Sequence, residues 1–536
     1  MQDVHGIRAR GGLAMRLNGW AAFLLSATAL AGGTASAEPF KCPRTGGSLT
    51  FGQEANVNSL DQHASNTIST RNVAMNIFEA LMTRDEQNNP IPDLAASVTE
   101  APDKLSYSFT LRIGVKFHNG KPMTSEDVAA SFDRYSKVGL ERSILTNVDK
   151  WETPDPGTFV IRMKKPQPTF LETLSSFSVP IVIHPSEMRD DPALRLRTVG
   201  TGPFMLDEFV PGGFVRIKRY DGYVPNTAYE QRTGFGGYRV ACLDSVTFRI
   251  VTEASARVAG LQTGELQAVE DVPTKSLAAL KTDPKIRLLP LPNWWVQISL
   301  ANMQKPPTDN LAFRRAVQAA LDVEEVMDAA TDGNFRLNVG FQYPGRAGYS
   351  DAGKATYNIK DPARAKALLK ESGYANQPVT ILTNKDYSSM YSAAVVMAEQ
   401  MKAVGINAQL QVVDWPTSVN MQLRGDTGWN YFHTGYGTQP ALGALSVMAF
   451  FAPPSAVYRP LEGKDDPDIV AAWNDMNTLP DPAARDAAYA RMQSVILDRA
   501  YALPFGSLTK VQASRSNVEN FVPFRIPRMS NVWLSN

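Results

Sequence analysis

The amino-acid sequence predicts an α/β protein with more than one domain. Strand-like and helix-like patterns are mixed along the whole chain, and residues 378–415 combine a strand, a helix and a second strand. The 536 residues exceed the roughly 250–300 at which a single hydrophobic core stops growing, so two or three domains are expected. Apolar residues make up 43% and charged residues 20% of the chain, a composition typical of folded globular proteins rather than disordered ones.

The segment 378–415 is the clearest unit of this pattern. Residues 379–383 read as a strand, a helix is expected from about residue 391 to residue 403, and residues 408–413 alternate as a second strand. A strand, a helix and a strand joined by a short return predict a parallel pair, and open α/β sheets bind ligands at the carboxyl ends of such strands. Tyr387 follows the first strand and Trp415 the second, so both side chains are expected near a ligand.

Two helix starts are also signalled. Thr124 or Ser125 precedes an apolar-periodic run with acidic residues in its first turn, where they favour the helix dipole. Asp361 precedes Pro362, which combines a capping residue with a proline at the first helical position.

The charge balance excludes binding driven by net charge. Lys and Arg number 54 against 53 Asp and Glu, so there is no positive surplus to attract a nucleic acid, and no nucleic-acid partner is expected.

The first residues have the pattern of an export signal. Three arginines within the first sixteen residues precede an apolar run at 20–30, and residues 35–37 (ASA) match the small-residue pattern of a cleavage site. The apolar run is short for a membrane-spanning helix, although an N-terminal anchor is the alternative. Cleavage near Ala37 is expected, with either Met1 or Met15 as the start, and the rest of the chain is expected outside the cytoplasm, in the periplasm.

Two cysteines in an exported chain suggest a disulfide. Cys42 and Cys242 both lie beside strand-like runs, at 48–51 and 246–251. A bridge across 200 positions would stabilise the fold by roughly 5 kcal/mol in the chain-entropy model. Two unpaired buried thiols are the alternative, and the bridge is favoured.

Motifs of catalysis and metal binding are missing. The sequence contains no G-x-S-x-G, no H-E-x-x-H and no paired cysteines at zinc spacing. Beyond residue 37 there are four histidines, His63, His118, His184 and His433, which are far apart in the sequence. No catalytic residue, metal or cofactor is therefore predicted. Because catalytic carboxylates leave no local signature, an exported hydrolase remains the alternative function.

Aromatic residues give the stronger functional signal. Trp294 and Trp295 are adjacent, and neighbouring side chains of a strand face opposite ways, so at most one of them is expected to face a given cleft. Later in the chain, Trp415 and the stretch 431–439 combine Trp, Tyr and His with Gly435 and Gly437, which predict a loop. Core packing is the alternative for any single ring. For Trp415 and 431–439 a binding site is favoured.

Several ordered motifs together resemble one known family. They are Pro92-Asp93-Leu94-Ala95 leading through residues 105–132, Gly200-Thr201-Gly202-Pro203-Phe204, residues 243–246 with 259–265, Lys305-Pro306-Pro307 with residues 313–316, and the segment 362–415. In these motifs and their spacing, the chain resembles the extracytoplasmic solute-binding proteins of ABC importers, family 5. This family includes the oligopeptide-, dipeptide- and nickel-binding receptors. The resemblance covers nearly all of the chain after the signal.

The resemblance implies a two-lobed clamshell of three domains, with mixed sheets and flanking helices. The implied division is a signal peptide at 1–37, domain I at 38–85, 200–294 and 503–536, domain II at 86–199, and domain III at 295–502. Two crossing segments, near 293–297 and 503–505, would form the hinge. Both cysteines would then lie in domain I.

The resemblance also implies the function and the site. A monomeric receptor would close around a peptide-like or other small solute and deliver it to the permease subunits of an ABC importer at the membrane. The residues implied to bind the ligand are Glu54, Trp294, Tyr387, Trp415, His433, Tyr436 and Gln439.

The chain departs from the peptide-binding pattern at two positions. Peptide-binding relatives hold the ligand's amine with an acid near 434–442, but here Gln439-Pro440 stands where an acid-Pro pair is common. Lys385 would substitute for the basic residue that dipeptide binders use, although the adjacent Asp386 partly cancels its charge. The sequence leaves open modified peptides, opine-like or sugar-like conjugates and other organic solutes. Nickel, with His433 as a ligand, is less favoured.

Overall fold

The computed structural model describes residues 38–65, 67–191, 194, 197–346, 348–423, 428–437, 448–453 and 464–535. The chain divides into Met1–Glu38 and the compact unit Pro39–Asn536, which contains every helix and strand named below. The expected signal peptide with its cleavage near Ala37, and the candidate Gln439, lie outside the described residues. Among the helices of the described ranges, none has the length and apolar character needed to span a bilayer.

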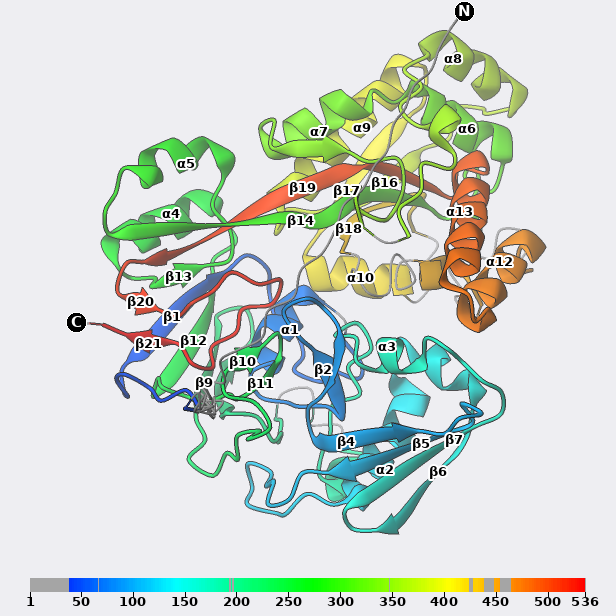
Figure 1. Ribbon diagram of the computed structural model, residues 1–536. Helices are drawn as coiled ribbons and strands as arrows, with labels where there is room; N and C mark the ends of the chain where they lie inside the picture. Colours follow the sequence, from blue (N-terminus) through cyan, green and yellow to red (C-terminus); the bar gives the residue numbers. More distant parts are fainter. Residues whose placement is uncertain are drawn as a thin grey trace, which may run out of the picture. The chain divides into compact units, whose positions relative to one another are not determined.

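Most strands belong to one mixed sheet of eleven strands (Figure 1). Its order is β17 (Ala408–Val413), β16 (Val379–Asn384), β18 (Tyr431–Tyr436), β14 (Ile286–Ala301), β19 (Ala502–Arg515), β13 (Ala268–Val269), β1 (Ser48–Gln53), β12 (Ser245–Ile250), β9 (Phe214–Arg219) and β8 (Phe204–Val210), with β15 (Phe335–Leu337) also paired to β19. The pairs β16–β17, β16–β18, β1–β12 and β1–β13 are parallel, and the other pairs are antiparallel.

Two long antiparallel strands, β14 and β19, connect the two sides of this sheet. Residues 286–291 of β14 pair with 510–515 of β19, and residues 295–300 pair with 502–508. At one end β19 pairs with β13, and at the other end β14 pairs with β18 (Figure 1). Below, the strands β17, β16 and β18 are called the β16 side, and β13, β1, β12, β9 and β8 the β1 side.

The pairing of β14 with β19 is interrupted at one place. The register shifts between Leu291 and Trp295, and Asn293 within this interval has a φ of 56°. Asparagine tolerates this left-handed conformation better than most residues. The regular alternation of side chains is therefore broken immediately before the two tryptophans.

Helices flank the strands, and both predicted helix starts are confirmed. They are α1 (Ile68–Ala74), α2 (Ser125–Val138), α3 (Phe170–Leu174), α4 (Ala254–Thr263), α5 (Thr274–Lys281), α6 (Leu311–Ala320), α7 (Val323–Thr331), α8 (Pro362–Glu371), α9 (Ser388–Ala403), α10 (Trp415–Leu423), α12 (Pro467–Thr478) and α13 (Pro482–Asp498). Short 3₁₀ helices are η1 (Arg142–Asn147), η2 (Ser186–Met188), η4 (Lys354–Thr356) and η6 (Ala449–Phe451). Thr124 and Asp127 form a capping box at the start of α2, and the Asp361 side chain accepts from the Arg364 N–H at the start of α8.

A second, four-stranded antiparallel sheet has a core of its own. Its order is β4 (Ala95–Glu100), β5 (Ser106–Leu111), β7 (Thr158–Met163) and β6 (Val148–Asp155). Phe109 and Phe159 of this sheet pack with Phe132 of α2 in one buried cluster. Three two-stranded ribbons complete the fold: β2 (Met82–Arg84) with β3 (Pro90–Pro92), β10 (Arg232–Thr233) with β11 (Gly236–Gly237), and β20 (Val518–Glu519) with β21 (Trp533–Leu534).

The predicted segment 378–415 is confirmed. β16, α9 and β17 follow one another, and the two strands pair in parallel from Val379 with Ala408 to Asn384 with Val413. The expected disulfide is confirmed as well, since Cys42 and Cys242 are bonded with their Cα atoms 5.6 Å apart. It joins the chain beside β1 to the chain beside β12, the strand with which β1 pairs. The α/β class is confirmed by the mixed sheet and its helices.

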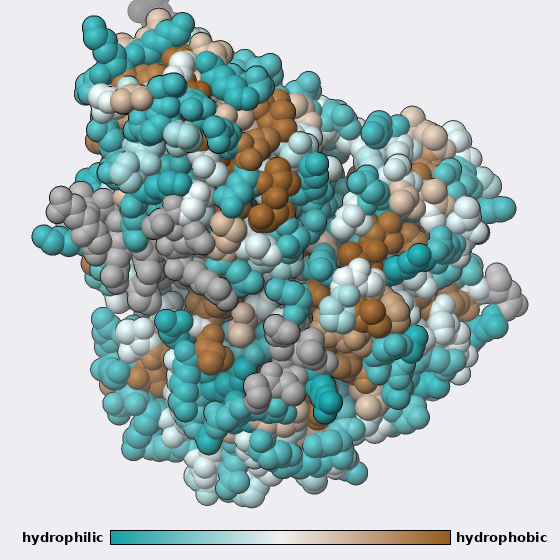
Figure 2. Space-filling model, turned by 180° about the vertical axis from the view of Figure 1, so that it is seen from behind, coloured by the Kyte–Doolittle hydropathy of each residue, from teal (hydrophilic) through white to brown (hydrophobic). Residues whose placement is uncertain are grey.

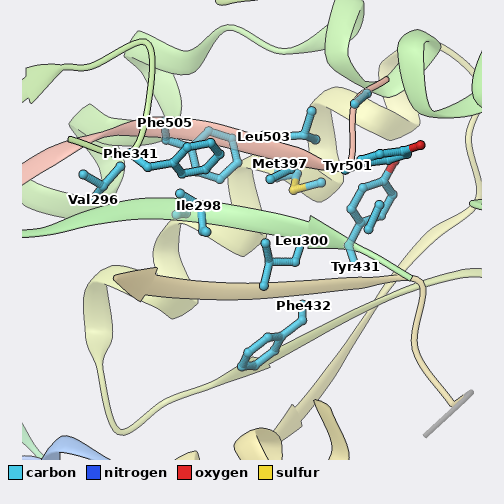
Figure 3. Packing of buried hydrophobic residues seen from close by; sticks show 14 of the residues in the cluster. Val296, Ile298, Leu300, Phe341, Met397, Tyr431, Phe432, Tyr501, Leu503 and Phe505 are labelled. Carbon is cyan, nitrogen blue, oxygen red and sulfur yellow. The ribbon is translucent and has the colours of Figure 1, made fainter. Parts of the chain in front are cut away.

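The apolar side chains gather between the sheet and its helices. Val296, Ile298 and Leu300 of β14 pack with Leu503 and Phe505 of β19 in the largest buried cluster (Figure 3). On the face of the molecule shown in Figure 2, hydrophobic residues occur in small groups separated by hydrophilic ones. Among the described residues the most exposed large hydrophobic side chain is Ile113, at 95%.

Candidate functional site

A cavity of about 100 Å³ is lined by two groups of elements. One part of its lining comes from α1, from the segment around residues 141–178 and from Arg525. The other part comes from β14, α9, α10, β18 and η6. A molecule in this cavity would contact both parts at once. Ligands of proteins usually bind in such concave, mostly apolar sites.

Four aromatic rings form one wall of this cavity. Trp415 stacks on Phe432 with ring centroids 6.3 Å apart and planes inclined by 17°. Tyr387 meets Trp415 edge-on at 5.4 Å and meets Trp295 edge-on at 5.3 Å. All four side chains are buried, with Trp415 the most exposed of them at 8%. Because each ring contacts the next, the wall offers a rigid surface for an apolar or planar group.

The ends of the parallel strands position two of these rings. Tyr387 follows β16, and its N–H donates to the Asn384 side-chain oxygen at 2.9 Å. Trp415 begins α10 after β17, and its N–H donates to the Asp386 carboxylate at 2.9 Å. Asp386 therefore ties the end of one strand to the end of its neighbour. This contact fixes Tyr387 and Trp415 side by side, as the strand–helix–strand pattern predicted.

The glycines of the stretch 431–439 lie differently from the expectation. Residues 431–436 form the strand β18 rather than a loop, and they pair with β14. A Cβ atom at Gly435 would lie 2.7 Å from three ring atoms of Trp295, and one at Gly437 would overlap the Arg525 guanidinium. For Gly435 the prediction of a loop was wrong, because glycine, which disfavours strands, is needed here for the close approach of the Trp295 ring, whereas Gly437 lies outside the strand.

Two arginines and one glutamate supply the charge of the cavity. Arg71 on α1 is 8% exposed, and its guanidinium carbon lies 5.4 Å from the centroid of the Phe177 ring. The Arg525 guanidinium lies 5.5 Å from the same centroid. Burial lowers the pKa of Arg71 to about 10, with a further lowering by the neighbouring Arg525 charge. Burial raises the pKa of the Glu141 carboxyl to about 7, and Arg71 opposes this shift.

Glu54 is held within an ion cluster near the interruption of β14. It accepts from the Arg257 guanidinium at 3.1 Å and from the Lys510 ammonium, and Lys510 also lies 3.5 Å from Glu270. Burial raises the pKa of Glu54 to about 7, while Lys510 and Arg257 act in the opposite direction. Lys510 also lies over the Trp294 ring, 4.7 Å from its centroid. The cluster thus connects β1, α4 and β19 to the aromatic residues.

The two adjacent tryptophans do not face opposite ways. The ring centroids of Trp294 and Trp295 are 5.9 Å apart, and both rings line a second small cavity, of about 80 Å³, beside Lys510. The expectation that at most one of them faces a given cleft was wrong. The pairing of β14 with β19 is irregular from Leu291 to Trp295, so the alternation of a regular strand does not apply at Trp294.

Other candidates lie away from the main cavity. His433 is fully buried and stacks on Phe505, with ring centroids 5.2 Å apart, and the Gln297 amide donates to its Nε2 at 3.0 Å. Burial lowers the pKa of His433 to about 3, so the ring is neutral. Lys385 is exposed and lies over Tyr391 rather than in the cavity. Across the described part of the chain, no group of three or more His, Cys, Asp or Glu residues could hold a metal ion.

A larger cavity of about 290 Å³ adjoins the main one. Glu141 and Ser178 line both, so the two cavities meet at these residues. The larger cavity is lined by η1, by residues 165–179 and by α12. Its lining is rich in hydroxyl and amide side chains, including Asn147, Gln167 and Asn474. A solute longer than the aromatic cavity has a polar space into which it can extend.

Of the ligand candidates named from the sequence, Tyr387, Trp415 and Tyr436 line the main cavity, and Glu54 and Trp294 line the small cavity behind it. Sequence reasoning missed Arg71, Glu141 and Arg525, which are distant from one another along the chain. Arg525 lies in a strand-free stretch, where no periodicity marks it. The available signal was the pair of glycines at 435 and 437. Glycine lets a large side chain come close to the backbone, and Trp295 and Arg525 do so here.

Comparison with known proteins identifies the family. Residues 89–453 match the bacterial extracellular solute-binding proteins, family 5, over their middle region. The chain belongs to this family. It is therefore a solute-binding protein, and its fold is the two-lobed α/β clamshell that the resemblance implied.

Curated relatives match most of the chain. It is 26% identical over 497 residues to the "Probable peptide ABC transporter periplasmic-binding protein y4tO" of Sinorhizobium fredii, covering 89% of this chain and 92% of that protein. It is 27% identical over 504 residues to the glutathione-binding protein GsiB of Escherichia coli O1:K1 / APEC, covering 91% of this chain and 94% of that protein.

Solved structures show the same fold. The periplasmic binding protein AgaA of A. tumefaciens R10, in complex with agropinic acid, superposes with a TM-score of 0.80 at 24% identity, covering 91% of this chain and 99% of that one. DppA of Helicobacter pylori, in complex with the peptide STSA, gives a TM-score of 0.79 at 21% identity, covering 92% of this chain and 99% of that one.

Proposed function

We propose that this chain is the substrate-binding component of an ABC importer, which captures a peptide-like or other small organic solute by closing two lobes around it. The observation that carries the proposal is the aromatic cavity, whose lining comes partly from β14, β18, α9 and α10 and partly from α1, the segment around residues 141–178 and Arg525. A solute that contacts both linings stabilises the closed arrangement by its differential affinity for it. Closure also excludes water, which strengthens the polar contacts inside.

The proposed hinge lies where β14 and β19 cross from one side of the sheet to the other. The interruption of their pairing between Leu291 and Trp295 supports a hinge there, because fewer backbone hydrogen bonds resist bending at that point. Opposite this interval the pairing of β19 is missing at Thr509.

We propose the domain division 38–85, 86–199, 200–294, 295–502 and 503–536 with one adjustment. Leu503 and Phe505 pack with Ile298 and Met397 in a single core, so they belong with the β16 side (Figure 3). The second crossing is accordingly proposed near Thr509 instead of 503–505.

The proposed solute-contacting residues are Tyr387, Trp415 and Tyr436, joined by Trp295 and Phe432. Glu54 and Trp294 are proposed to support them from the ion cluster, because Glu54 already accepts from two cations. Gln439 stays a proposal from the resemblance alone. His433 is not included, because its ring is turned into the core against Phe505.

The relatives support the importer proposal. One carries the name of a peptide ABC transporter periplasmic-binding protein, and another is named for glutathione binding. We propose by this likeness that the chain acts as a monomer in the periplasm after cleavage near Ala37, and that it delivers its solute to membrane permease subunits. It is proposed to have no catalytic activity.

Native mass spectrometry and thermal melting test the proposal together. Protein purified from the periplasm is measured under native conditions to identify any bound small molecule, and that molecule is then added to protein freed of it by unfolding and refolding. The melting temperature is expected to rise while the molecule is recovered unchanged. Chemical conversion of the molecule would favour the exported hydrolase, and the absence of any bound or stabilising solute across a broad metabolite panel would contradict the proposal.

A further inference from the structure

Unpaired hydrogen-bond donors surround the main cavity. Four buried polar atoms of its lining have no hydrogen-bond partner: Arg71 Nε, Arg525 Nε, Tyr387 Oη and Trp415 Nε1. Each of them carries a hydrogen that it can donate. A buried donor without a partner destabilises a fold, because it has lost its hydrogen bonds to water, so four around one cavity point to a ligand that accepts hydrogen bonds.

The charge of the cavity points to the same kind of ligand as the unpaired donors. Arg71 and Arg525 bring two positive charges to the Phe177 ring, and neither guanidinium forms an ion pair with a carboxylate among the described residues. Glu141 is the one acidic residue among the described residues of the lining. Buried guanidinium groups are normally paired with carboxylates or phosphates, because removal from water is otherwise too costly.

The arginines are not explained as structural supports. Arg71 makes no side-chain hydrogen bond among the described residues, and its contact partner is the face of Phe177. Arg525 donates from Nη1 to the Trp294 carbonyl at 2.8 Å and also has a side-chain hydrogen bond with Tyr343, but its Nε has no partner. Buried arginines elsewhere in the chain are paired more fully: Arg239, for example, contacts both Glu79 and Asp93.

We propose that the solute is an organic carboxylate, whose negative group lies against Arg71 and Arg525 and whose less polar part packs on the wall of Trp295, Trp415 and Phe432. This inference rests on the proposed function and adds the chemical class of the solute. A solute bearing only a primary ammonium would meet two repelling cations there. The planar guanidinium fork suits a carboxylate, with which it forms two parallel hydrogen bonds.

The test compares matched ligand pairs on matched variants. The ligands are N-acetylphenylalanine and glutarate, each paired with its primary amide, together with phenethylamine and the solute identified by native mass spectrometry. The proteins are the wild type, Arg71→Gln, Arg71→Lys and Arg525→Gln. Arg364→Gln serves as the control, because Arg364 is exposed on α8 and its side chain forms no hydrogen bond or ion pair among the described residues. Binding is measured by thermal shift and calorimetry.

Carboxylates are expected to raise the melting temperature of the wild type and of Arg364→Gln, while the amides and the amine do not. Arg71→Gln is expected to weaken carboxylate binding about 10- to 150-fold, the loss of one charge-assisted hydrogen bond, and Arg71→Lys to weaken it less. Without ligand, Arg71→Gln is expected to melt no lower than Arg364→Gln, because it removes a buried charge and its repulsion of Arg525. If Arg71 only supported the fold, Arg71→Gln would melt at a lower temperature than Arg364→Gln.

Three results would overturn the inference, and they separate it from the proposed function. If amides or the amine bind as well as carboxylates, or if the co-purified solute is neutral or cationic, the chain is a solute receptor but not one for anions. If Arg71→Gln binds the carboxylate as tightly as the wild type, the assigned residues are wrong. If no compound binds, including those of a periplasmic extract, both the inference and the proposed function fail.

Discussion

Gly435→Ala should destabilise the fold and distort the solute site, because the added methyl group would clash with the Trp295 ring. The added Cβ would lie 2.7 Å from Cδ1, Cδ2 and Cε2 of Trp295, closer than real Cβ atoms come to ring carbons. Trp295 cannot retreat easily, because its Nε1 donates to Gln297 at 3.0 Å and Tyr387 lies edge-on at 5.3 Å. Overpacking of this kind typically costs about 1–3 kcal/mol. The shifted ring would also alter the cavity wall.

The assay is urea unfolding followed by tryptophan fluorescence, with solute affinity measured by calorimetry. Gly157→Ala is the control, because Gly157 is exposed, has no left-handed φ, and its Cβ would meet only an Asp155 side-chain oxygen at 3.4 Å. The control should change the unfolding free energy by less than about 0.5 kcal/mol. In a Trp295→Phe background, Gly435→Ala should cost less than in the wild type, since a smaller ring leaves room.

A Gly435→Ala protein that unfolds and binds like the wild type would refute the reasoning. It would mean that the Trp295 ring is free to move from Gly435, and the rigid aromatic wall would lose its basis. An equal cost in the Trp295→Phe background would show that the damage arises elsewhere.

Three further changes test other contacts. Trp415→Ala should weaken solute binding about tenfold or more, because the ring that stacks on Phe432 is lost from the cavity wall. Its circular dichroism spectrum should stay near normal. An unchanged affinity in calorimetry would show that Trp415 does not belong to the site. Burial raises the pKa of Glu141 to about 7, so this carboxyl is neutral below pH 7 and negative above it. Carboxylate affinity should therefore rise about 2- to 5-fold between pH 8 and pH 6, and Glu141→Gln should abolish this dependence; a fall toward pH 6 would contradict the assignment. Replacing Cys42 and Cys242 by serine should lower the unfolding free energy by about 5 kcal/mol in urea, because a long loop is released; an unchanged value would show that the bridge contributes nothing.

Local patterns made the aromatic part of the site predictable. The alternation of residues 379–383 and 408–413 placed Tyr387 and Trp415 at neighbouring strand ends, and the structure brings both rings to the cavity. That inference needs only the geometry of a parallel strand pair, which is fixed over a short stretch of chain.

The charged part of the site had no local signal. Arg71, Glu141 and Arg525 come from α1, from the start of η1 and from the last strand-free stretch, and only the tertiary fold brings them to one cavity. Gly435 was misread for a different reason. Glycine usually indicates a loop. At Gly435 the Trp295 ring occupies the space where a Cβ atom would lie, so tertiary packing requires glycine in a strand despite its low strand propensity.

The central claim, that two lobes close around a solute, is tested most directly by a distance between spin labels. Lys137 on α2 and Lys370 on α8 are exposed and lie on different lobes of the proposed clamshell, whereas Lys370 and Glu399 on α9 lie on one lobe. Each pair is replaced by cysteine, labelled, and measured by pulsed electron resonance with and without the solute found in native mass spectrometry. The account predicts that the solute shortens and narrows the Lys137–Lys370 distance distribution and leaves the Lys370–Glu399 distribution unchanged. Identical Lys137–Lys370 distributions in the two states, under conditions where calorimetry shows binding, would contradict it.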